Sequence, residues 1–129
     1  MKNALSKKVW LKSGAYLVIE VTEALTVIDV NTGKAEFHSN KEKTFEKINL
    51  EAALEISKQL RIRNISGIII VDFINMSKKE SYQNLEGILK SYVDCDYVKC
   101  NIWGRTHLGL MEISRQKKEK PLKEIVGDK

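Results

Sequence analysis

The sequence predicts a single α/β domain, with one mixed β-sheet and two main helices in the order β-β-α-β-α-β-β. Three observations support this fold class. Two short apolar segments near the N-terminus are separated by three residues, a long amphipathic segment covers residues 44–63, and a continuous apolar run covers residues 68–73. A chain of 129 residues has the size of one domain and can bury a continuous core.

The two N-terminal segments predict an antiparallel hairpin. In AYLVIEV (15–21), residues alternate between two sets with the period of a strand, and the three residues TEA separate this segment from LTVIDV (25–30). The residues NTGK that follow have turn chemistry, and AEFH (35–38) could form a further short strand.

The segment 44–63 changes to the period of a helix. Its apolar residues fall in one arc of a helical wheel and its charged residues in the opposite arc. The apolar arc contains Leu50, Ala53, Leu54, Ile56 and Leu60. We expect the helix to end at NISG (64–67), just before the next strand.

The remaining elements follow from local patterns. The run IIIVDF (68–73) is apolar without alternation, which predicts a central strand covered on both faces. Ser77 and Glu80 have the spacing of a capping box, which predicts a helix from there to about Val93. The segments 97–103 and 108–114 predict two closing strands, and we expect the charged tail after them to fray.

Composition limits the classes of protein. Lys and Arg outnumber Asp and Glu by 22 to 17, a net charge of +5 that is compatible with a polyanionic partner. The basic clusters SKKVWLK and SRQKKEKPLK could be solvated surface or phosphate contacts. No apolar run is long enough for a membrane segment and no signal peptide is visible, so we expect a cytoplasmic location. The two cysteines and two histidines lack zinc-ligand spacing, so no zinc is expected.

Asp29 and Asp72 are the candidate functional residues. If the helix over 44–63 connects parallel strands, both acids lie at the carboxyl edge of the sheet, where ligands bind in open α/β folds. Two converging carboxylates would repel each other unless a cation lies between them, and oxygen-only ligation suits Mg²⁺ or Mn²⁺. Asn31 would point to the same side as Asp29. The alternative is that these residues only form turns and caps.

Three stretches together resemble the ribonuclease E/G family. They are KVWLKSGAYLVIEVTEALTVIDVNTGK, NLEAALEISKQLRIRNISGIIIVDFINM and LGLMEISRQ, and the resemblance extends from about Ala4 to Leu122. In that family this region is the catalytic DNase I-like subdomain of a longer endoribonuclease that acts on single-stranded RNA. The resemblance therefore implies an enzyme that hydrolyses RNA phosphodiesters in RNA processing and decay.

The resemblance also implies roles for individual residues. Asp29 and Asp72 would hold the catalytic Mg²⁺, for which Mn²⁺ could substitute, and Asn31 would be the active-site asparagine. Lys99 occupies the place of a basic residue in the pocket for an RNA 5′-monophosphate. Arg105 and Arg115 are further candidate phosphate contacts, with solvated surface charge as the alternative.

Other parts of the family's enzymes are not visible in this sequence. The RNA-binding S1 domain and 5′-sensor that would precede this region, and the zinc-link that would follow it, do not occur here. We therefore expect residues 1–129 to be one catalytic subdomain of a parent enzyme that forms homo-oligomers. One alternative stays open, a non-catalytic assembly or binding module with weak Mg²⁺ affinity. The opening hairpin and the lack of regular β-α alternation argue against another, a phosphoacceptor-type domain modified on Asp72.

Overall fold

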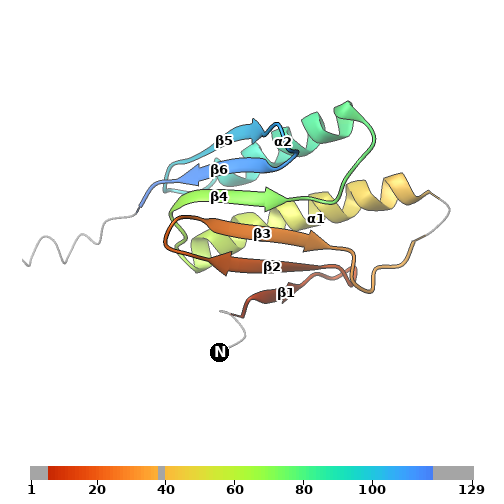
Figure 1. Cartoon of the computed structure of the whole chain (residues 1–129), viewed down its shortest axis with the longest axis horizontal. Helices are drawn as coiled ribbons and strands as arrows, with labels where there is room; N and C mark the ends of the chain where they lie inside the picture. The colour runs from red at the N-terminus through yellow and green to blue at the C-terminus, as the bar shows by residue number, and fades with distance from the viewer. Residues whose placement is uncertain (1–5, 38–39, 118–129) are drawn as a thin grey trace, which may run out of the picture.

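A computed structural model describes residues 6–37 and 40–117, which form a six-stranded mixed sheet with two helices (Figure 1). The strands are β1 (Lys8–Trp10), β2 (Tyr16–Val21), β3 (Thr26–Asn31), β4 (Gly67–Asp72), β5 (Cys100–Arg105) and β6 (Met111–Arg115). The helices are α1 (Lys41–Ile62) and α2 (Lys79–Val93). The predicted fold class and element order are confirmed, with the short strand β1 added at the N-terminal end.

The strands are arranged in the spatial order β1-β2-β3-β4-β6-β5. β2 and β3 form the predicted antiparallel hairpin, and β5 and β6 form a second one. Helix α1 carries the chain from β3 to β4, and these two strands are parallel, as the crossover predicts. β4 and β3 therefore end at the same edge of the sheet.

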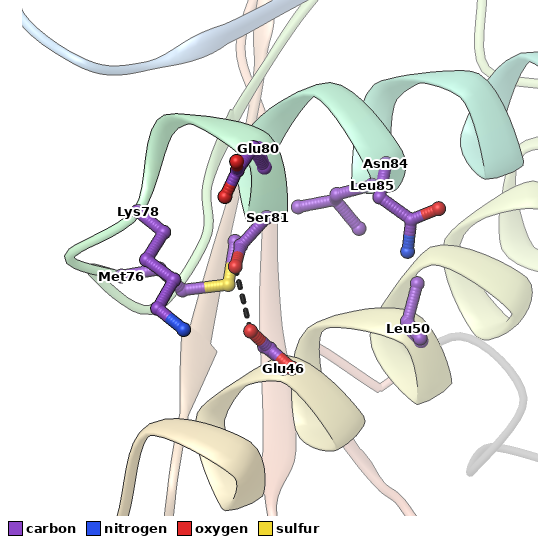
Figure 2. Close-up of a pocket in the computed structure, with 8 residues that line it drawn as sticks. All are labelled: Glu46, Leu50, Met76, Lys78, Glu80, Ser81, Asn84 and Leu85. Atoms are coloured by element: carbon purple, nitrogen blue, oxygen red, sulfur yellow. Dashed lines mark hydrogen bonds between the residues drawn. The ribbon is translucent and has the colours of Figure 1, made fainter.

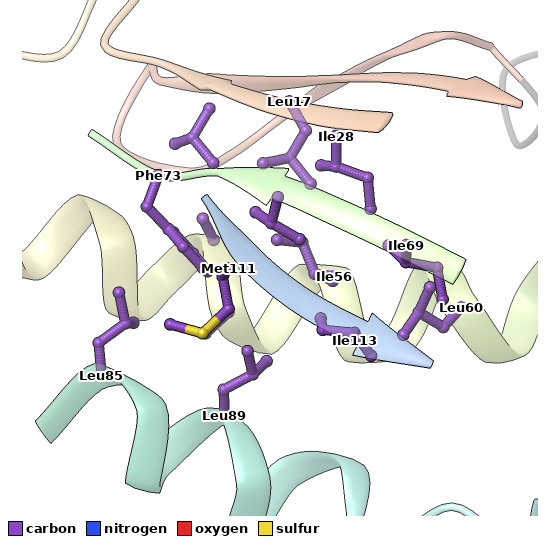
Figure 3. Close-up of a cluster of buried hydrophobic side chains, with 14 of the residues drawn as sticks. Leu17, Ile28, Ile56, Leu60, Ile69, Phe73, Leu85, Leu89, Met111 and Ile113 are labelled. Carbon is purple, nitrogen blue, oxygen red and sulfur yellow. The ribbon is translucent and has the colours of Figure 1, made fainter. Parts of the chain in front are cut away.

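Both helices pack on one face of the sheet, and the core lies between them and the strands (Figures 1 and 3). Each strand alternates its side chains between the two faces, so every second residue enters this core. The largest fully buried side chains come from the sheet and from both helices; they are Leu17, Ile19, Ile28, Ile48, Ile56, Leu60, Ile69, Leu85, Leu89, Met111, Ile113 and Val71.

The prediction that residues 68–73 are covered on both faces is wrong. Ile69 and Val71 are buried on the helix side, but Ile68, the second residue of β4, is 48% exposed. The opposite side of the sheet has no helix against it in the part of the chain that is described (Figure 1). We call this side the uncovered face; it carries the residues that alternate with the buried ones, including Tyr16, Val18, Asp29, Asn31, Ile70 and Asp72.

The starts of both helices differ from the prediction. α1 begins at Lys41 rather than residue 44, because the side chain of Asn40 accepts a hydrogen bond from the Lys43 amide and caps the helix. The capping box at Ser77 does not form: α2 begins at Lys79, and the Ser77 amide instead donates to a carboxylate oxygen of Glu42 at 3.0 Å.

Two smaller expectations also change. Leu54 is 41% exposed, because the buried arc of α1 is rotated toward Asn49 and Ala52. Residues 35–37 form no strand, and the last residue of that predicted strand, like most of the predicted fraying tail, lies outside the described residues. Neither α1 nor α2 is apolar enough over sufficient length to span a membrane.

Candidate active site

Two aspartates lie side by side on the uncovered face. In the parallel pair of β3 and β4, Asp29 is the register partner of Asp72. Their neighbours Ile28 and Val71 are buried on the helix side, so alternation turns both carboxylates to the other side. Asp29 is half-buried and Asp72 is exposed. The structure thus brings together the two acids that the sequence predicts at one edge.

Asn31 belongs to the same cluster. Its side-chain nitrogen donates a hydrogen bond to a carboxylate oxygen of Asp29 at 3.1 Å. Because Asn31 is two residues after Asp29 on the same strand, both side chains project to the uncovered face. The amide fixes one oxygen of Asp29 and keeps its own carbonyl oxygen as a hydrogen-bond acceptor.

The two neighbouring carboxylates repel each other, and a positive charge between them would reduce this repulsion. The pKa of Asp72 is raised above its ordinary value, first by partial burial and second by the negative charge of Asp29. Both effects oppose ionisation of Asp72, and a cation between the two carboxylates would relieve the second. Within residues 6–37 and 40–117, no three His, Cys, Asp or Glu side chains gather into a metal-binding group. The described chain therefore offers two carboxylates, not a complete cage.

The loop after Asp72 is fixed by residues that the sequence analysis missed. Asn49 of α1 is fully buried, and its side-chain amide both donates to the Ile74 carbonyl and accepts from the Ile74 amide, each at 2.9 Å. The Met76 amide donates to the hydroxyl of Tyr82 at 2.7 Å. The only signal for Asn49 in the sequence is a polar residue next to the apolar arc of a helix, which is common on solvated helices too.

The three basic residues that the sequence singles out lie in three different environments. Arg105 is exposed at the end of β5, and its guanidinium carbon lies 3.7 Å from the ring centroid of Tyr82. Arg105 and Val71 both pair with Met111, so Arg105 lies at the same edge of the sheet as Asp72. Of the three, it is the one at the same edge of the sheet as the acids, but its contact with Tyr82 of α2 places its guanidinium on the helix side, and β6 lies between its strand and β4.

Lys99 lies at the other end of the sheet. Its carbonyl accepts from the Gln116 amide, and the next residue, Cys100, pairs with Arg115, which also pairs with Gly67 at the start of β4. Asp72 is the last residue of that strand. A phosphate held by Lys99 would therefore lie about five residues, or about 17 Å, from Asp72 along the strand direction.

Arg115 does not face solvent, which argues against its predicted role as a phosphate contact. Its side chain is 2% exposed, and its Nε donates to Asp96 at 2.8 Å. The guanidinium also donates to the Asn64 side chain at 3.1 Å and to the Ile65 carbonyl at 2.9 Å. These protein oxygens use the donors that a phosphate would need, so we assign Arg115 a structural role.

The cavity of about 280 Å³ between α1 and α2 is separate from the acids (Figure 2). It lies on the helix side of the sheet, where Ser81 donates a hydrogen bond to Glu46 at 2.6 Å and so joins the two helices. None of the predicted site residues lines it. The acids instead lie on an open surface, which suits an extended polymer better than a small enclosed ligand.

Nearly the whole chain is similar in sequence to proteins named ribonuclease G and ribonuclease E. The profile of the ribonuclease E/G family matches residues 1–118. Over nearly all of its length the chain is 42% identical to ribonuclease G of Haemophilus influenzae, 39% identical to ribonuclease G of Escherichia coli (strain K12) and 43% identical to ribonuclease E of Nostoc sp.. It spans 26% of each ribonuclease G and 19% of that ribonuclease E. On these matches, the chain belongs to the ribonuclease E/G family.

Proposed function

We propose that this chain is a catalytic part of an endoribonuclease that hydrolyses single-stranded RNA with the help of Mg²⁺ held by Asp29 and Asp72. The observation that carries the proposal is the register pairing of these two acids on the uncovered face. Membership in the ribonuclease E/G family supports the reaction class. The chain spans about a quarter or less of each relative, and we propose the activity for an enzyme of the relatives' full length that contains this chain.

The donor set fits Mg²⁺, and Mn²⁺ could replace it. Mg²⁺ is commonly held by one or two carboxylates, with water and substrate phosphate oxygens in the remaining positions. Two aspartates on an open surface match this pattern, since they leave room for a phosphate. The raised pKa of Asp72 is consistent with a pair that binds a cation in its working state. Bound there, the cation would neutralise charge on the scissile phosphate and make an attacking water more acidic.

The other residues of the site have positioning roles. Asn31 holds the Asp29 carboxylate through its hydrogen bond of 3.1 Å, and its side-chain carbonyl oxygen can accept a hydrogen bond from the attacking water. Arg105 lies at the same edge on the helix side, stacked on Tyr82, and its guanidinium can donate to the oxygens of a phosphate that extends past this edge. Hydrolysis would leave a 5′-phosphate on one product and a 3′-hydroxyl on the other.

A second candidate function is a non-catalytic module that binds Mg²⁺ weakly. The observation that favours it is the lack of a third acid near Asp29 and Asp72 among the residues that the structure covers. We favour the catalytic proposal because an incomplete protein ligand set is what a site needs if substrate phosphate completes it. Both candidate functions predict weak cation binding without RNA. Only the catalytic one predicts cleavage of RNA, so a cleavage assay distinguishes them.

Two measurements test the proposal. The first is an amide NMR titration of the chain with Mn²⁺, in which we expect signals of residues 29–31 and 72 to broaden before all others. Asp29→Asn and Asp72→Asn should each abolish this local effect. Asp94→Asn is the control, because Asp94 is an exposed acid paired with Lys90 on α2. Broadening that is equal at Asp94 and at Asp29 would refute a specific cation site.

The second measurement is cleavage of a fluorescent single-stranded RNA by an enzyme of the relatives' full length in which this chain replaces the matching region. We expect Asp29→Asn and Asp72→Asn to remove cleavage while circular dichroism shows an unchanged fold. Asp94→Asn should cleave like the unmodified enzyme. Full activity in either site variant would refute the catalytic assignment. Loss of activity together with unchanged Mn²⁺ broadening would show that the acids act without holding the cation.

A further inference from the structure

We propose that Trp10 and Tyr16, with the ammonium groups of Lys8 and Lys34, form a stacking platform that binds a nucleobase of single-stranded RNA beside the acid pair. We call these four residues the platform. The proposal rests on the proposed function for the identity of the ligand, and its test needs neither the cation nor cleavage. A nucleic acid is the ligand that combines aromatic faces with negative charge along one strand.

The sheet register places the platform next to the acids. Trp10 pairs with Tyr16, and Tyr16 pairs with Asn31, so these three form one row across β1, β2 and β3. The adjacent row runs from Lys8 through Val18 and Asp29 to Asp72. Since strands lie about 4.8 Å apart, Trp10 is about 10 Å from Asn31. An RNA strand whose phosphate lies at the acids could therefore place a neighbouring base on Trp10.

The platform and the acids share one face of the sheet. Val9 packs against the core, so Trp10 beside it projects to the opposite side. Tyr16 alternates with the fully buried Leu17 and projects to the same side. The rings of Trp10 and Tyr16 are 5.0 Å apart between centroids and tilted by 57°. They form one continuous aromatic surface at the edge of the sheet.

Two cations lie on this aromatic surface. The Lys8 ammonium is 4.6 Å from the Trp10 ring centroid and 4.3 Å from that of Tyr16, and the Lys34 ammonium is 5.5 Å from the Trp10 centroid. Cation–π attraction holds both groups over the rings in this structure, so a base that stacks there takes the place of an ammonium group, which then moves to the adjacent phosphate. The ion pairs found in the described residues involve neither lysine, so both charges stay available for a phosphate.

Trp10 leaves a large part of its ring in water. It is 49% exposed, although its hydrophobic surface would favour burial. A base stacked on this exposed part would bury apolar surface on both partners while the two lysines contact the flanking phosphates. Stacking uses the flat face that every base has, so we expect tolerance of sequence and a requirement for unpaired bases.

The chain contains a matched control for Trp10. Trp103 is the second tryptophan, and it is 66% exposed on the uncovered face. It lies on β5 at the opposite edge of the sheet from β1, and its indole nitrogen donates to the Ser114 hydroxyl at 2.8 Å. Trp103→Phe leaves Trp10 as the only tryptophan, and Trp10→Phe leaves Trp103, so fluorescence can report each position alone.

The experiment is a titration of both single-tryptophan proteins with a single-stranded RNA decamer and with an abasic decamer, in EDTA so that no cleavage occurs. We expect the RNA to quench Trp10 and not Trp103, and the abasic strand to quench neither. Trp10→Ala should weaken RNA binding roughly 5- to 150-fold, the range for loss of one base stack, and Trp103→Ala should not change it. Lys8→Gln and Lys34→Gln should each reduce the salt slope of log K by roughly 0.7.

Three results would overturn the platform. Equal quenching of Trp10 by the abasic strand would show backbone contact without stacking. Unchanged affinity of Trp10→Ala would show that the ring does not bind, and Trp10→Phe guards against a folding artefact, since it keeps an aromatic ring. No quenching up to about 1 mM RNA, above the usual range for non-specific binding, would also refute it. Asp29→Asn leaves the platform unchanged. The cleavage assay and the quenching of Trp10 therefore test the proposed function and the platform separately, and either proposal can be refuted without the other.

Discussion

Removing one partner of the buried ion pair between Asp96 and Arg115 should destabilise the chain more than removing one partner of an exposed ion pair. Its side chains are 3% and 2% exposed, and the Arg115 Nε donates to an oxygen of Asp96 at 2.8 Å. In Asp96→Asn the side chain keeps its shape, and one oxygen can still accept from the Val98 amide. The new amide nitrogen, however, would meet Arg115 as donor against donor, and the guanidinium would stay buried without a counter-charge.

Breaking a buried pair by removing one partner typically costs about 3–5 kcal/mol, because the remaining charge is uncompensated. A domain of this size is stable by about 5–15 kcal/mol, so Asp96→Asn should remove a large fraction of the free energy of unfolding. The expected fall in Tm is roughly 10–20 °C, measured by circular dichroism at pH 7. The control is Asp94→Asn, whose pair with Lys90 is more than half exposed and should contribute well under about 1 kcal/mol.

The pH dependence of the free energy of unfolding is a second test of the contribution of Asp96. Burial raises the pKa of Asp96, but hydrogen bonds from Arg115 and the Val98 amide, with the charges of Arg115 and Arg61, outweigh it and lower the pKa below 3.8. In the interval between the folded pKa and 3.8, the unfolded chain binds more protons than the folded chain. The contribution of Asp96 is therefore complete above that interval and is lost as the pH falls through the folded pKa.

The double variant Asp96→Asn/Arg115→Met closes the test. It removes the uncompensated charge but leaves the Ile65 carbonyl without the donor that Arg115 provides at 2.9 Å, so it should recover part of the lost stability. A loss of stability in Asp96→Asn no larger than that in Asp94→Asn would contradict the role of the buried pair. A stability difference between the unmodified chain and Asp96→Asn that persists unchanged at low pH would contradict it equally.

Three further substitutions test how the site is supported. Asn49→Ala should cost about 1–3 kcal/mol in urea unfolding and speed hydrogen exchange at Ile74, because both backbone groups of Ile74 lose their partner; unchanged exchange would contradict this. Gly33→Ala should lower the free energy of unfolding by at least about 1–2 kcal/mol, because the φ of Gly33 is +53° and an added Cβ would meet a carbonyl oxygen of the β1–β2 turn. Gly87→Ala is the control on an exposed part of α2 and should stabilise the chain by about 0.5–1 kcal/mol. A loss of stability in both variants would exclude the steric explanation. Asn40→Ala should cost about 1 kcal/mol by thermal unfolding, and Asn40→Ser should retain most of the cap.

The shared edge of the two acids was predictable because it follows from topology. A helix between two apolar strands favours a parallel arrangement, and parallel strands end at one edge of the sheet. The structure adds that the two strands are adjacent, in the register that pairs Asp29 with Asp72. Their catalytic and metal-binding roles stay predictions, which the titration and cleavage assays address. The platform was not predicted, because Trp10 lies in a strand of three residues that has no readable period.

The environments of Ile68 and Arg115 could not be read from neighbouring residues. The apolar run of β4 is compatible with cover on both faces, and only the packing of both helices on the same side leaves Ile68 exposed. Arg115 begins a charged stretch and therefore reads as surface, but its partner Asp96 lies 19 residues earlier in the chain. Likewise Ser77 has the spacing of a cap, and it loses that role because Glu42 from the other helix takes its amide.

The alternation that builds the core also determines where the acids lie. Asp29 stands between the buried Ile28 and Val30, and Asp72 follows the buried Val71. A slip of one residue in either strand would move its carboxylate into the core and bring an isoleucine or valine out to water. Burial of an unpaired carboxylate is strongly unfavourable, so the apolar residues that stabilise the fold also exclude the one-residue slips that would place the two acids on opposite faces of the sheet. The acid pair is therefore maintained by the packing on the opposite face of the sheet, and a substitution in that core that permitted such a slip would remove the pair without touching either aspartate.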